Sequence, residues 1–411
     1  MPRFEPFPGL RYAVDDLAEV TAPPYDVIDA AERAGLAARH AHNVVRIDLP
    51  GDDGAGDPYE NAAATFTAWR RDGVLAADPP SLYPYRMTFT DETGATRATL
   101  GVLGALGIGP DERGDILPHE HTTPKAKSDR LRLLRTTRAN LSAVWALSLT
   151  PGLTARVDLD AAEVVAAWSD GEGVRHELWR LADPAAVAAV TAAVAANPLV
   201  VADGHHRYET CQQYGAEPGS PAGADATLCL VVELDEGQLS VAPIHRLITG
   251  LPDGTDVAAA LAPYFAAGGL EALPDASIVD RLVAEGALAL VTADGMRLLR
   301  PDDAALTAAA AGAASTAAGT AAGTAGMLDS VRVATAAAAL PPHELSYQHG
   351  VGHAVAAVRE GRAQAALLIR PVSVEQIRST AYARGRMPPK STFFWPKPRT
   401  GPVFRAMDDP T

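Results

Sequence analysis

Cysteine, positive charge and uninterrupted apolar sequence are all scarce in this chain. Its two cysteines, Cys211 and Cys229, are too few for a disulfide framework and lack the spacing of a metal knuckle. The longest apolar stretches are rich in alanine and broken by glycine or threonine, so none of them reads as a membrane span. The first residues, Met1–Glu5, show neither the basic nor the apolar segment of a signal peptide. We therefore expect a globular cytoplasmic protein with no membrane partner.

Acidic residues outnumber basic ones, and the formal net charge is -15. Binding along a nucleic-acid backbone requires a broad basic face that displaces counterions, and the chain has no basic helix-turn-helix stretch. We expect no nucleic-acid partner, while a local basic cleft for a small anion remains compatible with the charge. The sequence gives no indication of the oligomeric state.

Residues 197 to 210 are the stretch around which we interpret the rest of the chain. The apolar run Leu199–Ala202 predicts a buried strand, and a helix is expected over residues 205 to 214, after the turn Asp203-Gly204. Such a turn leaves backbone N–H groups unpaired at the helix start, and glycine lets a ligand approach them closely. The side chains expected beside these groups are those of His205, His206 and Arg207. We expect this turn to hold an anion, and a phosphate fits it best.

A second motif, residues 117 to 134, concentrates imidazole and charged groups. Pro118 and Pro124 interrupt its first half, for which we predict a loop, and Ser128 or Asp129 is a good N-cap for a helix over its second half. The groups of interest are His119, Glu120, His121, Lys125, Lys127 and Arg130. The alternative is an ordinary solvated loop, but the prolines favour an arrangement that keeps these groups together.

The N-terminal region contains a proline-rich loop. Its Pro23-Pro24 pair forces an extended backbone before Tyr25 and Asp26, which either line a pocket or form a rigid surface turn. We predict that a strand follows over residues 43 to 49.

A similar choice arises near the C-terminal end. Lys390, Ser391 and Thr392 precede an aromatic run, residues 393 to 395. The segment either closes over a ligand, with Lys390 at a phosphate, or fills the core with its aromatic side chains.

The remaining elements are predicted from periodicity and turn residues. Ala62, Phe66 and Trp69 fall on one face of a helix over residues 59 to 71. Alternating segments predict one hairpin over residues 82–89 and 98–108 and another over 227–234 and 239–242, and a short helix is expected over 161–168.

Four blocks of sequence resemble an uncharacterised family called domain of unknown function 1015. The blocks are Ala22–Ile28, Leu117–Glu120, Val201–Glu209 and Met387–Lys397. Within the third block, Asp-Gly-His-His-Arg resembles the phosphate-gripping turn of the ParB/sulfiredoxin superfamily, and most of all that of its free serine kinase branch. The resemblance implies an α+β fold with a ParB-like core elaborated at both ends. We expect an N-terminal lobe over residues 1–110, the ParB-like nucleotide-binding core over 111–250, and a C-terminal lobe over 251–411 with a flexible Ala/Gly/Thr-rich insertion at 304–326.

The resemblance also implies roles for individual residues. Glu120 stands where the serine kinases carry a catalytic carboxylate, and it would accept the proton of the substrate hydroxyl. Asp203 would position Mg²⁺ or the acceptor, while Arg207 and the turn N–H groups would hold phosphate. Glu120 and Asp203 lie further apart in the chain than a compact ParB-like core requires. Either an insertion occupies residues 150 to 196 or the assignment of Glu120 is wrong.

These parts suit phosphoryl transfer, which needs phosphates and metal held in line and a base for the acceptor. We expect Mg²⁺-dependent transfer between ATP or ADP and the hydroxyl of a small metabolite, with serine or phosphoserine suggested by the resemblance. The catalytic residues would be Glu120, Asp203 and His206, with Asp203 also at the metal. The residues expected at the phosphates or nucleotide are Gly204, His205, His206, Arg207, Lys125, Lys127, Lys390, Ser391 and Thr392. The residues expected at the substrate are Tyr25, Asp26, His119 and Arg130.

Two other functions use the same residues. His119 and His121, with Asp203, His205 or His206, are also possible ligands of Zn²⁺, Mn²⁺ or Fe²⁺ in a phosphatase or other hydrolase. A nucleotide-binding regulatory module without turnover is the third alternative, and the acidic balance counts against its DNA-associated form.

Overall fold

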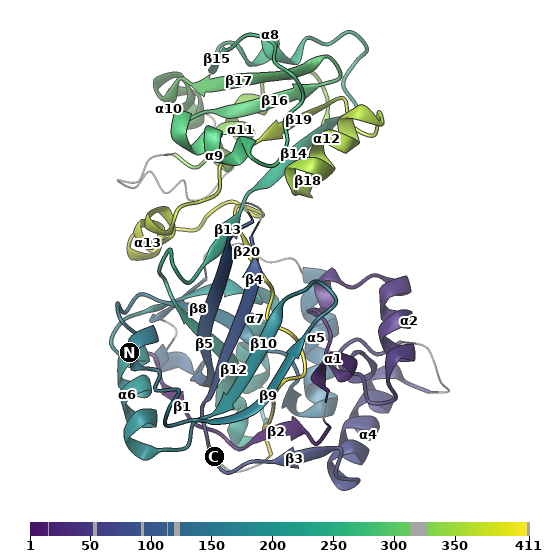
Figure 1. Ribbon diagram of the computed structural model, residues 1–411, viewed down its shortest axis with the longest axis vertical. Helices are drawn as coiled ribbons and strands as arrows, with labels where there is room; N and C mark the ends of the chain where they lie inside the picture. Colours follow the sequence, from purple (N-terminus) through teal and green to yellow (C-terminus); the bar gives the residue numbers. More distant parts are fainter. Residues whose placement is uncertain are drawn as a thin grey trace.

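A computed structural model of the chain describes residues 1–14, 16–51, 56–91, 94–112, 114–118, 124–312 and 327–408. These residues fold into two lobes joined by a narrow connection (Figure 1). Both ends of the chain lie in the lower lobe, and the strands of the upper lobe fall between residues 244 and 368. Sheets and helices occur together in both lobes, so the α+β class expected from the sequence is confirmed.

A nine-stranded mixed sheet forms the body of the lower lobe. Its strand order is β6-β11-β8-β12-β5-β4-β10-β9, with β1 paired to β5 beside this path. The β11–β6 and β12–β8 pairs are parallel, and the other pairs are antiparallel. The strands are β1 (Phe4–Glu5), β4 (Tyr83–Thr90), β5 (Thr96–Gly107), β6 (Ile116–Pro118), β8 (Val144–Ser148), β9 (Glu163–Ser169), β10 (Arg175–Arg180), β11 (Leu199–Asp203) and β12 (Ala226–Glu233).

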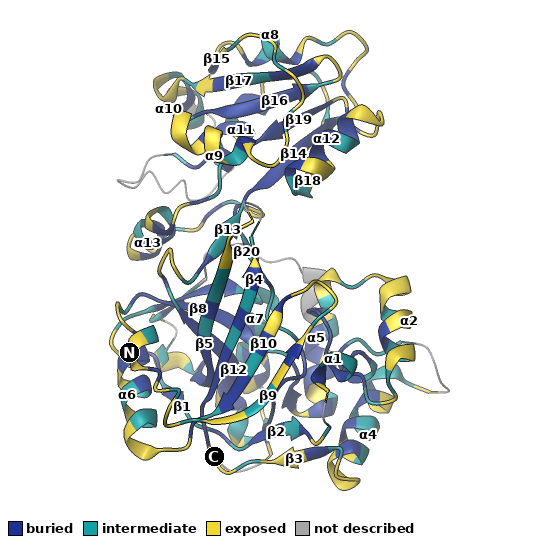
Figure 2. Cartoon of the chain, in the orientation of Figure 1, coloured by how far each residue is buried: buried dark blue, intermediate teal, exposed yellow. Residues whose placement is uncertain are grey.

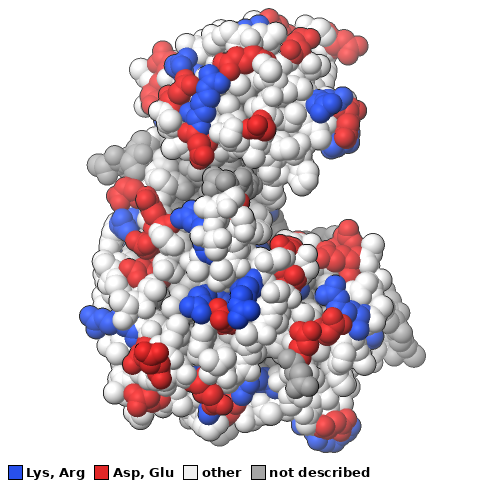
Figure 3. Space-filling model, viewed as in Figure 1, with Lys and Arg blue, Asp and Glu red and all other residues white. Residues whose placement is uncertain are grey.

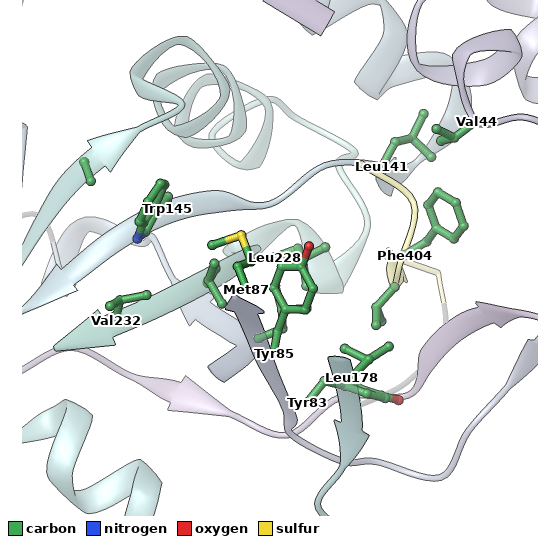
Figure 4. Packing of buried hydrophobic residues seen from close by; sticks show 14 of the residues in the cluster. Val44, Tyr83, Tyr85, Met87, Leu141, Trp145, Leu178, Leu228, Val232 and Phe404 are labelled. Carbon is green, nitrogen blue, oxygen red and sulfur yellow. The ribbon is translucent and has the colours of Figure 1, made fainter. Parts of the chain in front are cut away.

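Both faces of this sheet are covered, which explains why its central strands are apolar without alternation. Along β12, Leu228 and Val232 face one hydrophobic cluster, whereas Cys229 faces the other. Aromatic side chains such as Tyr85 and Trp145 fill the first cluster (Figure 4). The dark central strands in Figure 2 show the result of this burial on both sides.

Helices and a smaller sheet complete the lower lobe. Residues of α5, α6 and α7 belong to the second cluster. The helices are α1 (Leu17–Val20), α2 (Ala30–Arg39), α3 (Val45–Asp48), α4 (Pro58–Arg71), α5 (Pro124–Thr137), α6 (Pro184–Ala195) and α7 (His205–Gly215). The smaller sheet has the order β3-β2-β21-β7, with β2 (Gly9–Tyr12), β3 (Leu75–Ala77), β7 (Ala139–Asn140) and β21 (Phe404–Ala406).

The upper lobe is a six-stranded sheet with helices around it. The strand order is β15-β17-β16-β19-β14-β18, with β14 (Ile244–Thr249), β15 (Phe265–Ala267), β16 (Leu288–Thr292), β17 (Gly295–Pro301), β18 (Glu344–His349) and β19 (Ala365–Leu368). Its helices are α8 (Val257–Leu261), α9 (Ile278–Glu285), α10 (Asp303–Gly312), α11 (Asp329–Ala337) and α12 (Val351–Arg359). Helix α13 (Val374–Tyr382) and the ribbon of β13 (Ser240–Ala242) and β20 (Phe393–Trp395) lie between the lobes (Figure 1).

Several predicted elements are confirmed, and four are wrong. The strand of residues 199–202 and the helix of 205–214 appear as β11 and α7, and the first hairpin appears as β4 and β5. Residues 45–48 form the short helix α3 instead of a strand, because their apolar side chains are buried by packing rather than by pairing in a sheet. Residues 163–169 form the edge strand β9 instead of a helix, since pairing with β10 overrides their alanine content.

The other two errors concern the pairing of two strands and the first residue of a helix. β12 lies between β5 and β8, and β13 pairs with β20, so the second hairpin is not formed. Helix α5 begins at Pro124, earlier than the predicted cap, because the first turn of a helix tolerates a residue without an N–H group.

The strands are divided between the lobes differently from the predicted boundaries. The nine-stranded sheet takes strands from both sides of the boundary predicted at residue 110, and β20 and β21 return the C-terminal residues to the lower lobe. Of the insertion predicted over residues 304–326, residues 304–312 belong to helix α10, in keeping with the high helix propensity of alanine, and residues 313–326 lie outside the described residues. No helix in the described part of the chain is both long and apolar enough to cross a membrane.

Candidate functional site

The turn between β11 and α7 has the form that the sequence predicts. β11 ends at Asp203, Gly204 adopts the left-handed conformation with φ of 85°, and α7 starts at His205. As the N-cap residue, Gly204 has no side chain with which to accept a hydrogen bond from the first turn. The N–H groups at this helix start are therefore left without the side-chain cap that serine or aspartate would supply, which suits them to an anion.

Gly204 also makes room for Arg207. A Cβ atom at residue 204 would stand 2.9 Å from Nε of Arg207 and 3.0 Å from its Cζ. The guanidinium thus folds back over the Cα atom of the glycine. A larger residue at this position would have to displace the arginine.

Two cations meet at the carboxylate of Asp203. Nη2 of Arg207 donates to its Oδ2 atom at 2.7 Å, and the Lys397 ammonium contacts its Oδ1 atom. Arg207 also donates through Nη1 to the carbonyl of Ala143, which ties it to the start of β8. The side chains of Asp203, Arg207 and Lys397 are only 15%, 11% and 18% exposed, so water screens these charges weakly.

The charges set the protonation state of Asp203. Burial alone would raise its pKa, but the ammonium of Lys397 and the guanidinium of Arg207 outweigh burial and hold the pKa well below its ordinary value. Asp203 is therefore ionised at neutral pH. It is a weak proton acceptor and a good partner for a cation.

A second charged group is centred on Arg130. Nη1 of Arg130, on α5, donates to the backbone carbonyl of Asp48 at 2.7 Å, and Nε donates to Asp129 at 2.7 Å. The guanidinium carbon lies 4.0 Å from the centre of the Tyr25 ring. Burial raises the pKa of the Asp48 carboxyl, and the charge of Arg130 opposes that shift. Tyr25 and Arg130, which the sequence predicts at the substrate, are thus in contact.

A small cavity joins the two groups. It has a volume of about 40 Å³, and Asp48, Arg130 and Arg207 line it together. The exposed Asp26 is close enough for its charge to act on Arg207. His205 and His206, on the first turn of α7, are both partly exposed. The structure therefore brings the predicted residues of the N-terminal loop, α5 and the turn into one region.

The predicted C-terminal residues are divided between two places. Lys390 is exposed, and its carbonyl accepts a hydrogen bond of 3.0 Å from Arg246. Ser391 is 1% exposed, lies 2.9 Å from the hydroxyl of Ser330 and lines a separate cavity of about 330 Å³. Thr392 is partly exposed. The lysine that contacts Asp203 is Lys397.

The second motif falls largely outside the described residues. His119, Glu120 and His121 are not described, and of Lys125 and Lys127 only the place in the first turn of α5 is known. β6, which leads to this motif, runs parallel to β11 and ends at Pro118, opposite Val201. Within the described ranges no group of three or more His, Cys, Asp or Glu residues is placed to hold a metal ion. The roles predicted for the motif remain predictions.

Sequence reasoning missed two residues of this region. Asp48 lies in an apolar run whose pattern gave no sign of a buried ion pair. Lys397 had a signal in the composition: the chain has only four lysines, Lys125, Lys127, Lys390 and Lys397, among 35 Lys and Arg residues. All four fall within or beside the motifs singled out for phosphate binding. Lysine differs from arginine in carrying a compact ammonium group, which suits a point contact with a phosphate.

Several solved structures match the chain at low TM-scores. A free serine kinase in complex with AMP is 14% identical, with a TM-score of 0.37 over 72% of this chain and 89% of that chain. A conserved hypothetical protein from Pyrococcus furiosus is 16% identical, with a TM-score of 0.34 over 71% of this chain and 90% of that chain. SbnI with C-terminal truncation, from Staphylococcus aureus, is 11% identical, with a TM-score of 0.37 over 72% and 85%. No curated protein matches the chain.

A family model matches most of the chain. The family is described as "Protein of unknown function (DUF1015)", and its match covers residues 4–337, from β1 to the end of α11. The matched region includes the N-terminal loop, α5 and the turn before α7. The chain belongs to this family, as the sequence blocks predict.

Proposed function

We propose that the protein transfers a phosphoryl group between a nucleotide, ATP or ADP, and the hydroxyl of a small metabolite. Serine or phosphoserine is the substrate that the motif resemblance suggests. The observation that carries this proposal is the turn of residues 203–207, where a helix start without a side-chain cap, two cations and an ionised carboxylate meet. Phosphoryl transfer depends mainly on such positioning and charge neutralisation.

In this proposal the first turn of α7 holds the nucleotide phosphates. Its backbone N–H groups point away from the helix, and His205 and His206 add side-chain donors beside them. Arg207 can donate to two phosphate oxygens at once, and Lys397 adds a compact positive charge. Both cations lie against Asp203, which only Gly204 separates from this helix start, so they are beside a phosphate held there.

Asp203 is the residue that fits Mg²⁺, because an ionised carboxylate supplies the oxygen ligand that this hard cation prefers. Mg²⁺ bound with ATP or ADP would neutralise charge on the phosphate oxygens. The same low pKa makes Asp203 a poor base for the acceptor hydroxyl. We assign that role to Glu120 on the strength of the motif resemblance.

Arg130 supports an acceptor that carries a carboxylate. Its Nη2 atom is buried and has no hydrogen-bond partner among the described residues, while its other nitrogens are engaged. A buried donor of this kind is costly unless a ligand or water satisfies it. The Tyr25 ring lies against this guanidinium, and the charge of the neighbouring Asp26 acts on Asp48 and Arg207.

The test is phosphorus NMR of the purified protein with Mg²⁺. One set of samples contains L-serine with ATP or ADP, and a second set contains phosphoserine with and without ADP. The variants are Glu120→Gln, His206→Ala and Lys397→Met, with His343→Ala as the matched control and Lys390→Met to compare the two candidate phosphate lysines. His343 lies in the upper lobe, where its Nδ1 atom is 2.9 Å from the carbonyl of Pro341.

Nucleotide-dependent interconversion of serine and phosphoserine that is lost in the three site variants and kept in His343→Ala would support the proposal. Loss in Lys390→Met but not in Lys397→Met would assign the phosphate lysine to the position predicted from the sequence. Phosphate release from phosphoserine without nucleotide would favour the metal-dependent hydrolase. Nucleotide binding without any turnover would favour the regulatory module.

A further inference from the structure

A ring of polar side chains is buried in the aromatic face of the main sheet. Tyr85 on β4 is 1% exposed and His176 on β10 is fully buried. Asp170, in the turn between β9 and β10, and Arg399, after β20, have side chains that are only 5% and 7% exposed. Polar groups in such a setting are costly unless their hydrogen bonds serve a purpose.

The contacts form a closed circuit that begins and ends on Arg399. Its backbone N–H donates to the hydroxyl of Tyr85 at 3.3 Å, and that hydroxyl lies 2.8 Å from Nδ1 of His176. Nε2 of His176 lies 3.0 Å from Oδ2 of Asp170, and the same oxygen is 3.6 Å from the guanidinium of Arg399. A carboxylate can only accept, so Nε2 carries the imidazole hydrogen and Nδ1 accepts from Tyr85.

Two members of the circuit, Asp170 and His176, are also held from outside it. Asp170 accepts backbone hydrogen bonds from Glu172 and Val174 through its other oxygen, at 2.9 and 3.1 Å. The His176 ring lies beside the rings of Tyr85 and Trp168, with centroids 5.8 Å and 5.0 Å away and ring planes inclined by 10° and 22°. The circuit is therefore a rigid anchor for whatever is attached to Arg399.

What is attached is Lys397, two residues earlier in the chain, with a single proline between them. We propose that Tyr85, His176 and Asp170 are positioning residues, which hold Arg399 by its backbone and side chain and so present the Lys397 ammonium to Asp203. The use of that ammonium for nucleotide binding rests on the proposed function, whereas the positioning itself does not.

The small number of lysines makes this testable without turnover. We would expose the full-length protein to a trace of acetic anhydride and measure by mass spectrometry how fast each of the four lysines is acetylated. The exposed Lys390 serves as the internal reference. An ammonium held against a carboxylate in a partly buried pair should react more slowly than this reference.

The key comparison is between two tyrosines of one strand. Tyr85→Phe removes the hydroxyl that holds Arg399, and Tyr83→Phe removes an equally buried hydroxyl that accepts from Gly9 at 3.1 Å and bonds Asp78 at 3.0 Å. We expect the Lys397 to Lys390 ratio of rates to rise about fivefold in Tyr85→Phe, which corresponds to loss of an ion pair worth about 1 kcal/mol. The ratio should stay at the wild-type value in Tyr83→Phe.

An unchanged ratio in Tyr85→Phe, or an equal rise in Tyr83→Phe, would overturn the proposal. If Tyr85→Phe fails to fold, the same ratio is measured in Arg399→Met, which removes the guanidinium and leaves Tyr85 and His176 in place. Wild-type protein with Mg²⁺ and ADP gives the separate reading of function, since bound phosphates should protect Lys397 further. A ratio that changes in Tyr85→Phe but not with the nucleotide would support the positioning of Lys397 by the circuit. It would contradict nucleotide binding at this lysine.

Discussion

At Gly204 the backbone and the chemistry of the candidate site both depend on the lack of a side chain. The positive φ of 85° costs a non-glycine residue free energy, and the space where its Cβ atom would lie is taken by the guanidinium of Arg207. Alanine at this position would therefore strain the turn and displace Arg207 from Asp203.

We predict that Gly204→Ala lowers the free energy of unfolding by roughly 2 to 4 kcal/mol, the sum of left-handed strain and the steric conflict. Urea denaturation measures this value. Gly73→Ala is the matched control, because Gly73 has a similar φ of 75° and nothing within 4 Å of the added Cβ atom. In the control the free energy of unfolding should fall by only about 1 kcal/mol. Equal losses in the two variants would show that the Arg207 side chain moves aside at no cost in free energy.

Asp203 should make stability depend on pH in the acid range. Its pKa is lowered in the folded protein, so it stabilises the fold above its ordinary value of about 3.9 and this contribution is lost as pH falls through the lowered value. We predict that Asp203→Asn costs about 2 to 4 kcal/mol at pH 6 and progressively less below about pH 4.

Denaturant melts of both proteins between pH 3 and pH 7 supply the comparison. Asp72→Asn is a useful control, because Asp72 has a lowered pKa from Arg71 but is on the surface. An energetic gap between wild type and Asp203→Asn that stays constant down to pH 3 would contradict the lowered pKa.

Among the elements, those with local signals were the ones predicted from the sequence. Helix α4 buries Ala62, Phe66 and Trp69, which recur at helical spacing, and the β11–α7 unit is marked by Gly204 after an apolar run. These signals act through neighbouring residues, so they depend little on distant partners. They also located the candidate turn of residues 203–207 correctly.

The elements that were wrong depend on distant partners. β13 pairs with β20, more than a hundred residues later, and no local pattern encodes that choice. β9 exists because β10 lies beside it. For the same reason the contact of Lys397 with Asp203 and the ion pair of Arg130 with Asp48 could not be predicted, since each joins segments that only the fold brings together.

The β20 strand shows how one position decides between core and surface. The Phe394 side chain is 1% exposed and lies 5.6 Å from the Trp145 ring, whereas its neighbours in β20 are half-buried. We predict that Phe394→Ala lowers the free energy of unfolding by about 3 to 5 kcal/mol through the cavity it leaves. Urea melts should show a smaller loss for Phe393→Ala, and the reverse order would place the wrong aromatic residue in the core.

At the scale of the whole molecule, the last residues complete the lower lobe. β21 lies between β2 and β7 in the smaller sheet, and Phe404 is fully buried with its ring 5.5 Å from Tyr12 and 6.0 Å from Phe66. Arg405 is 2% exposed and donates to the carbonyls of Ala226 and Gly223 at 3.0 and 2.8 Å. The chain therefore leaves the lower lobe, forms the upper lobe and then returns to complete the lower lobe.

This arrangement predicts unequal effects for two truncations. A chain that ends at Arg386 lacks β20, Lys397 and β21, and we expect its lower lobe to lose cooperative folding because a central strand and several buried side chains are missing. A chain that ends at Asp408 keeps all three and should melt like the full-length protein. Calorimetry, with proteolysis to identify the protected fragment, distinguishes the lobes: protection confined to residues of the upper lobe in the shorter chain is the expected result. Protection of the β11–α7 turn in that chain would instead mean that the lower lobe folds without its C-terminal strands, and that the tail contributes only Lys397 to the candidate site.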